Sequence, residues 1–172
     1  MLTKATIEDL KSIPLFRGLT EDELRYLARD LEERDYKKEE IIYEEGDISG
    51  FLYIVQQGRV EITKKVPTGH RQVIAVKEAG SFFGEISFFE NRQHGSRVKA
   101  LMETRLILLN KLIYDATERE KPILIHKLLR EIILVVSANL ENTNDMFLQM
   151  IHYLFYGGKS EEVEIPKGKS NQ

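Results

Sequence analysis

The sequence contains no cysteine and no long hydrophobic run, and these two absences exclude several classes of protein. Without cysteine there is no disulfide, no thiolate nucleophile and no zinc site with cysteine ligands. No apolar stretch approaches the roughly 20 residues that cross a bilayer, and the first residues, MLTKATIEDLKSI, lack the apolar centre of a signal peptide. We therefore expect a cytoplasmic chain that does not use a membrane.

A strong charge of either sign is also missing. The formal net charge is −3, with 42% hydrophobic and 31% charged residues, which is the composition of an ordinary soluble protein. Proteins that bind nucleic acid usually carry a strongly basic domain or face. The composition therefore predicts a globular protein without an overall basic surface for nucleic acid.

Recognisable catalytic and metal-binding motifs are absent as well. The sequence has neither a GxSxG nucleophile turn nor a phosphate-binding P-loop. Its four histidines show no pair at metal-ligand spacing with a suitable carboxylate: they are His70, His94, His126 and His152. The charged runs DLEERD and KSEEVE are expected to be solvated faces. We therefore predict a protein that is not an enzyme and that holds no metal and no cofactor.

What the sequence does contain is an order of helices, then strands, then one long helix. At 172 residues it is long enough for one domain with a helical extension. Thr20 followed by Glu23 is a capping box before an apolar helical face. From Asp35 the pattern changes to short apolar runs broken by glycine: EEIIYEEGD, GFLYIVQQGRVEIT, PTGHRQVIAVKEAG and SRVKALMETRLILLN. Such spacing predicts an antiparallel barrel or a double-sheet roll.

After Lys111 the pattern is helical again. Pro122 suits the first turn of a helix, and apolar residues then recur at intervals of three and four: Ile125, Leu128, Leu129, Ile132, Ile133, Val136, Leu140, Met146, Phe147, Met150, Ile151, Leu154 and Phe155. Gly157 and Gly158 are expected to end this helix. We therefore divide the chain into a domain over 1–121, a helix over 122–156 and a mobile tail over 157–172.

Several motifs from Ile13 to Leu109 together resemble the cyclic nucleotide-binding domain family, which includes the catabolite activator and protein kinase A regulatory types. They are IPLFRGLTEDELRYLA, YKKEEIIYEEGD, FLYIVQQGRVEI, the glycine of PTGHR, and GSFFGEISFF. The resemblance implies a mainly β fold with flanking helices. Its centre would be the β-roll of that family, a double-stranded β-helix or jelly roll, followed by the long C-terminal helix.

The stretch GEISFFENRQHGSRVKA is similar to the family's phosphate-binding cassette. The resemblance implies that Glu85 accepts a hydrogen bond from a ribose 2′-hydroxyl and that backbone N–H groups after Gly84 face the phosphate of cyclic AMP or cyclic GMP. The ligand-binding residues it implies are Phe83, Gly84, Glu85, Ile86, Ser87, His94, Gly95, Ser96 and Arg97. The alternative is that Gly84 only makes a turn and Glu85 is only a first-turn carboxylate.

His94 stands where the family has the arginine that neutralises the phosphate. Guanidinium is always charged and can hold two phosphate oxygens, whereas imidazole is mostly neutral at pH 7. Arg92 or Arg97 is a candidate replacement cation, although both also fit solvated surface charges. A bound phosphate would raise the pKa of His94 and strengthen binding in acid. Gly95 offers no hydroxyl for contacting a guanine.

The long helix predicts how the protein associates. In relatives of the catabolite activator type, the helix after the roll pairs with its twofold mate, so we expect a homodimer through 122–156; the alternative is a helix folded back on the roll. Three asparagines, Asn139, Asn142 and Asn144, either set the register or break the helix. The residues after Gly157 show no two-helix DNA-binding pattern, so we expect no direct DNA binding and an unknown protein partner.

Two functions fit these patterns. The first is a sensor that takes a cyclic nucleotide or another anionic small molecule into the roll and signals through the long helix. The second is a ligand-free dimerisation or docking module that retains only the fold.

Overall fold

Two short capped helices begin the part of the chain that the structure describes. The structure is a computed structural model, and it describes residues 6–156. Helices α1 (Ile7–Ser12) and α2 (Glu21–Leu27) flank a 3-10 turn, η1 (Pro14–Phe16). The predicted capping box is confirmed: the Thr20 hydroxyl accepts from the Glu23 N–H, and the Glu23 carboxylate accepts from the Thr20 N–H. The expected helix end at Gly157 and the tail over 157–172 lie outside the described residues.

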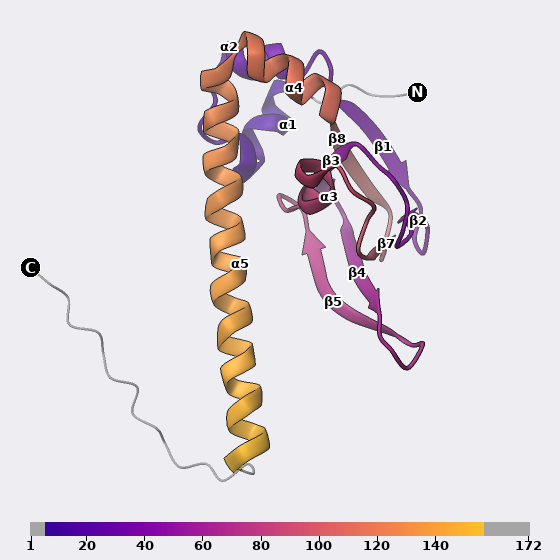
Figure 1. The fold of residues 1–172 in the computed structure, drawn as a ribbon. Helices are drawn as coiled ribbons and strands as arrows, with labels where there is room; N and C mark the ends of the chain where they lie inside the picture. The colour runs from indigo at the N-terminus through magenta and orange to yellow at the C-terminus, as the bar shows by residue number, and fades with distance from the viewer. Residues whose placement is uncertain (1–5, 157–172) are drawn as a thin grey trace, which may run out of the picture. The chain divides into compact units, whose positions relative to one another are not determined.

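Eight antiparallel strands form two four-stranded sheets, as the glycine-punctuated runs predict (Figure 1). One sheet has the order β1 (Glu32–Tyr36), β8 (Thr104–Asn110), β3 (Phe51–Gln57) and β6 (Phe82–Phe83). The other has the order β2 (Ile41–Tyr43), β7 (Arg97–Ala100), β4 (Arg59–Lys65) and β5 (Arg71–Glu78). The predicted double-sheet roll is therefore confirmed.

One of the charged runs lies partly inside the protein. DLEERD was expected to be a solvated face, but Glu32 to Tyr36 form β1, which pairs with β8 along its whole length. Because side chains alternate along a strand, Glu33 turns inward and is only 7% exposed, while Glu32 and Arg34 remain exposed. The expectation was wrong for Glu33, because the strand pattern was expected to begin only at Asp35, whereas β1 begins at Glu32.

Two hydrophobic clusters make up the core. The first lies inside the roll and includes Tyr43, Tyr53, Phe83, Val98 and Leu108. The second joins the N-terminal helices to the outer side of β3 and β8 and to the start of the last helix; among its members are Leu10, Phe16, Leu24, Leu52, Phe88, Ile107, Leu124, Ile125, Leu128 and Ile132. The cassette helix α3 (Glu85–Glu90) contributes Phe88 to this second cluster.

Two helices follow the strands. Helix α4 (Lys111–Glu120) is capped by Asn110, whose side chain accepts from the Leu112 N–H. Helix α5 (Pro122–Tyr156) begins at the predicted proline and is continuous through the three asparagines, so the predicted alternative of a helix break there is excluded. The chain divides into two compact units, with the boundary inside α5 between Ile133 and Leu134. No helix among residues 6–156 is both long and apolar enough to cross a membrane.

Candidate functional site

A glycine turn begins the cassette. Gly84 joins β6 to α3 with φ +82°, a left-handed conformation that glycine adopts readily. A Cβ at this position would lie 3.0 Å from the Tyr53 ring and 3.4 Å from the Phe51 carbonyl oxygen. The turn therefore needs glycine for both its conformation and its space. Phe83, just before it, is buried in the roll and stacks on Tyr53 with ring centroids 5.1 Å apart.

The His94 side chain points into the protein. It is only 3% exposed, its Nδ1 lies 2.6 Å from the Ser87 Oγ, and its ring stacks on Tyr43 with centroids 3.6 Å apart and planes at 7°. The backbone is held as well, because the His94 N–H donates to the Asp47 carbonyl at 2.9 Å and its carbonyl accepts from the Gly46 N–H at 2.8 Å. The loop after α3 is thus fixed to the turn after β2.

This environment favours neutral imidazole. Burial lowers the pKa of His94, and the negative charge of Asp47 opposes that change only in part. The Nε2 atom is buried and has no hydrogen-bond partner among residues 6–156. Since Nδ1 already pairs with Ser87, the ring supplies no cation to the cassette near pH 7.

Tyr43 is a second buried side chain beside the cassette whose pKa is shifted. Burial is the main reason that the pKa of Tyr43 is raised; the charge of Glu85 raises it further, while a hydrogen bond with the Ser96 side chain lowers it. Glu85 itself is half-buried in the first turn of α3. Ser96 is therefore a partner of Tyr43, and Glu85 acts on the Tyr43 hydroxyl through its charge.

The two nearby arginines face other carboxylates. Arg92 is exposed, and its Nε lies 2.5 Å from a Glu90 carboxylate oxygen. Along β7, Val98 and Ala100 are buried, whereas Arg97 and Lys99 alternate with them on the other face of the strand. Arg97 pairs there with Glu44 at 3.3 Å. Arg92 therefore lies at the surface, whereas the Arg97 Nε atom is itself buried beside Glu44 and has no hydrogen-bond partner among residues 6–156.

The remaining predicted residues are the main-chain donors and a glycine. Ile86 is exposed, Ser87 is buried, and both lie in the first turn of α3, where N–H groups have no partner within the helix. Gly95 is exposed, and a Cβ added there would meet no atom within 4 Å. Position 95 therefore has room for a larger residue.

Tyr43 and Asp47 belong to this arrangement but were missed by sequence reasoning. Tyr43 forms the stacking surface for His94, and Asp47 holds the His94 backbone. The alternating pattern in EEIIYEEGD marks Tyr43 as a strand residue, but nothing local connects it with a position about fifty residues later. The glycine of EEGD was the available signal for a turn near Asp47.

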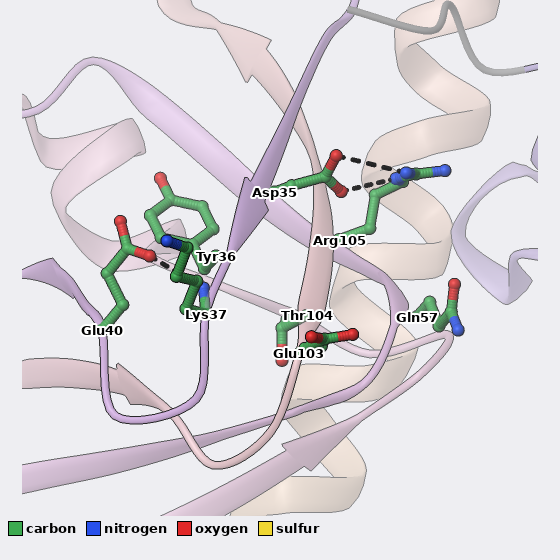
Figure 2. Close-up of a pocket in the computed structure, with 8 residues that line it drawn as sticks. All are labelled: Asp35, Tyr36, Lys37, Glu40, Gln57, Glu103, Thr104 and Arg105. Atoms are coloured by element: carbon green, nitrogen blue, oxygen red, sulfur yellow. Dashed lines mark hydrogen bonds and ion pairs between the residues drawn. The ribbon is translucent and has the colours of Figure 1, made fainter. Parts of the chain in front are cut away.

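A separate hollow lies at the edge formed by β1, β3 and β8. It has a volume of about 520 Å³ and is lined by Asp35, Tyr36, Lys37, Glu40, Gln57, Glu103, Thr104 and Arg105, shown in Figure 2. Arg105 donates to both oxygens of Asp35, at 2.6 and 3.2 Å. None of the predicted ligand-binding residues lines this hollow. Residues 6–156 also contain no group of three or more histidine, aspartate or glutamate side chains arranged for a metal.

Comparison with known proteins identifies the family of the roll. The family model described as Cyclic nucleotide-binding domain matches residues 33–113. The Cyclic AMP receptor protein of Thermus thermophilus is 29% identical over 119 residues, which are 69% of this chain and 55% of that protein. This chain therefore spans about half the length of that relative.

Solved structures agree with this match. A cyclic nucleotide-binding domain from Methylobacillus flagellatus superposes with a TM-score of 0.75 at 24% identity, covering 84% of this chain and 81% of that one, which shows the shared fold. The regulatory domain of Toxoplasma gondii PKA, solved with cAMP, gives a TM-score of 0.57 at 26% identity and covers 64% of this chain and 42% of that one. The matching family is a ligand-binding regulatory domain, not a catalytic one. The roll of this chain, over residues 33–113, therefore matches the cyclic nucleotide-binding domain family.

Proposed function

We propose that this protein is a regulatory sensor: its roll receives a small ligand at the cassette, and α5 carries the output. The observation that carries the proposal is the position of Glu85, in the first turn of α3 directly after the left-handed Gly84 turn. A carboxylate in this place can accept a hydrogen bond from a ribose hydroxyl. The N–H groups of Ile86 and Ser87 can meet the phosphate of cyclic AMP or cyclic GMP. The names of the relatives, several of which mention cyclic AMP, support the same ligand class.

The affinity for a cyclic nucleotide is expected to be low. His94 is neutral and already bonded to Ser87, so the phosphate charge meets no cation at the arginine position. Hydrogen bonds to a charged group contribute about 1.5–3 kcal/mol each. The loss of a two-bond guanidinium contact therefore weakens binding by about two or more powers of ten.

The same histidine supports a second function, a ligand-free docking module. Ser87 bonds to His94 at 2.6 Å and Tyr43 covers the ring, so these groups satisfy one another without a ligand. In this version the roll is a stable platform and α5 alone makes the contact with a partner.

In both versions we propose a homodimer through the second half of α5. With Leu140 at position a of a heptad, the a and d positions form one seam of exposed side chains: Val136, Leu140, Thr143, Phe147, Met150 and Leu154. Most of them are apolar, as a two-stranded coiled coil requires. Earlier in α5, the chain's own core already buries four apolar side chains: Leu124, Ile125, Leu128 and Ile132. A protein partner would bind the dimer; its identity is not part of this proposal.

Calorimetry with cyclic AMP and cyclic GMP tests the sensor. We expect weak binding at pH 7.5 and tighter binding at pH 5.5, because protonated His94 would supply the missing charge.

His94→Arg should increase affinity at least tenfold, since guanidinium can also stack on Tyr43. Glu85→Ala should abolish binding. Arg92→Ala is the matched control and should change nothing, because Arg92 is exposed and pairs with Glu90.

The outcomes separate the two functions. Absence of heat and of a thermal shift at millimolar nucleotide, in the wild-type protein and in His94→Arg, would reject the sensor and leave the docking module. Loss of binding in Arg97→Ala would instead show that Arg97 leaves Glu44 to hold the phosphate.

Sedimentation of the chain ending at Ile133 tests the dimer: this shortened chain should have the mass of a monomer.

A further inference from the structure

The end of α5 is apolar over a wider arc than a dimer seam needs. In the middle of the helix, the positions beside the seam are polar: Ser137, Asn139 and Asn144. From Met146 to Phe155 the corresponding positions are apolar, and Leu148 and Phe155 extend the surface further around the helix. At 100° per residue the apolar positions there cover an arc of about 220°. Gln149 and His152 occupy the rest.

This wide surface is uncovered. Leu148, Tyr153 and Phe155 are 61%, 70% and 79% exposed. A two-stranded coiled coil covers positions a and d and partly covers e and g, but Leu148 and Phe155 are at position b, which faces away from the seam. Even in the proposed dimer, these two side chains would remain in water. Contiguous exposed apolar surface of this kind marks an interaction site.

The charges on this part of α5 argue against a membrane surface as the occupant. Helices that lie on membranes carry lysine and arginine on their polar face. From Leu134 to Phe155 there is no lysine or arginine, and the charged residues are Glu141 and Asp145, both acidic. Anionic lipid would therefore repel this segment.

A second dimer fits better. The wide surface continues the dimer seam without a gap, and each dimer would present two such helix ends side by side. Four helices that each contribute a broad apolar arc can bury it in a four-helix bundle. We propose that residues 146–155 of two dimers pack together and make the protein a dimer of dimers. This proposal rests on the dimer seam proposed above.

Sedimentation equilibrium of the full chain tests this assembly. We expect the wild-type protein to have four times the chain mass of 20.0 kDa. Leu148→Glu combined with Phe155→Glu should reduce it to twice the chain mass, because only the surface between dimers is changed. The matched control is Asn142→Glu combined with Gln149→Glu, which adds the same charge at position c and should leave the fourfold mass unchanged. Leu140→Glu, in the seam, should give monomers.

The possible results are distinct. A wild-type monomer would reject both the seam and the bundle. A wild-type dimer that Leu140→Glu dissociates would reject only the bundle, as would a fourfold mass that persists in the Leu148 and Phe155 variant. Flotation of the full chain with vesicles of phosphatidylcholine and phosphatidylserine is the last test: binding that the Leu148 and Phe155 variant loses would overturn the proposal in favour of a lipid surface.

Discussion

At the scale of single residues, His94 links the cassette to the pH dependence of folding. Burial lowers its pKa in the folded protein, so below about pH 6.5 the unfolded chain binds the proton more readily. His94 therefore has no effect on the free energy of unfolding above the ordinary histidine pKa. Below that pKa, it lowers the free energy of unfolding as the pH drops. Between about pH 6.5 and about pH 5 this effect is at most about 2 kcal/mol.

Urea unfolding of the wild-type protein and His94→Asn across this range checks the prediction. Asparagine does not titrate, so the variant should lack the His94 part of the acid-dependent loss while keeping the part due to carboxylates. Equal pH dependence in the two proteins would show that the imidazole is not held neutral.

Glu33 is the second residue whose burial predicts a measurable effect. Burial raises the pKa of its carboxyl group, only partly offset by the charge of Arg105, and its Oε2 atom has no hydrogen-bond partner among residues 6–156. The group therefore destabilises the fold when it is ionised, above its raised pKa. Glu33→Gln should increase the free energy of unfolding at pH 7 by about 1 kcal/mol. Thermal melting checks this, with the exposed Glu32→Gln as the control; a loss of stability in Glu33→Gln alone would contradict it.

The local backbone of the cassette could be predicted from the sequence better than the contacts of its side chains. Gly84 and Glu85 could be placed because a turn glycine followed by a first-turn carboxylate is a local pattern. The burial of His94 could not be predicted in this way. It depends on Tyr43, which lies on strand β2, and on Ser87, which lies in the first turn of α3. Contacts between distant segments are set by strand pairing, which a single sequence does not display.

At the scale of elements, the turn glycines differ in how strongly they are required. Gly58, between β3 and β4, has φ +94°, and a Cβ there would lie 2.5 Å from the Thr104 Oγ1 and 2.6 Å from the Glu103 carbonyl oxygen. Gly69, in the turn between β4 and β5, has φ +88° but open space around it. Both have backbone conformations that favour glycine, but only Gly58 is also enclosed.

Alanine substitutions at Gly58 and Gly69 distinguish backbone strain from a steric clash. Gly69→Ala should lower stability by about 1 kcal/mol through backbone strain, whereas Gly58→Ala should lower it by about 3 kcal/mol or more because the strand ends must also move. Chemical denaturation of both variants provides the comparison. Equal losses of stability in the two variants would mean that the start of β8 can shift to make room for the new methyl group at little cost.

Strand and helix boundaries show the same division between local and distant signals. The capping box at Thr20 and the proline at the start of α5 are local, and both elements begin where they predict. Strand β1 was hidden because its sequence, EERDY, is almost entirely charged and polar. Strand β1 forms because it pairs with the apolar strand β8. The residues that determine this pairing lie about seventy positions later in the sequence.

At the scale of the whole molecule, the two halves of α5 should behave differently when the chain is shortened. Leu124, Ile125, Leu128 and Ile132 are at most 6% exposed and pack against the N-terminal helices, and Lys127 pairs with Glu23 at 2.8 Å. Beyond Ile133, most side chains are exposed. The first half of α5 is therefore part of the core of its own unit, although the sequence pattern alone assigned 122–156 to one separate helix.

Two shortened chains test this division. A chain ending at residue 133 should retain a cooperative thermal transition within a few degrees of the full protein, apart from any stability that self-association adds. A chain ending at residue 121 should have no such transition. The loss of one large buried aliphatic side chain costs about 2–5 kcal/mol, so four such losses cost about 8–20 kcal/mol, which is comparable with the usual stability of a domain, about 5–15 kcal/mol. Circular dichroism distinguishes the two cases. If the shorter chain melts as cooperatively as the longer one, the start of α5 is an appendage of the roll and not a part of its core.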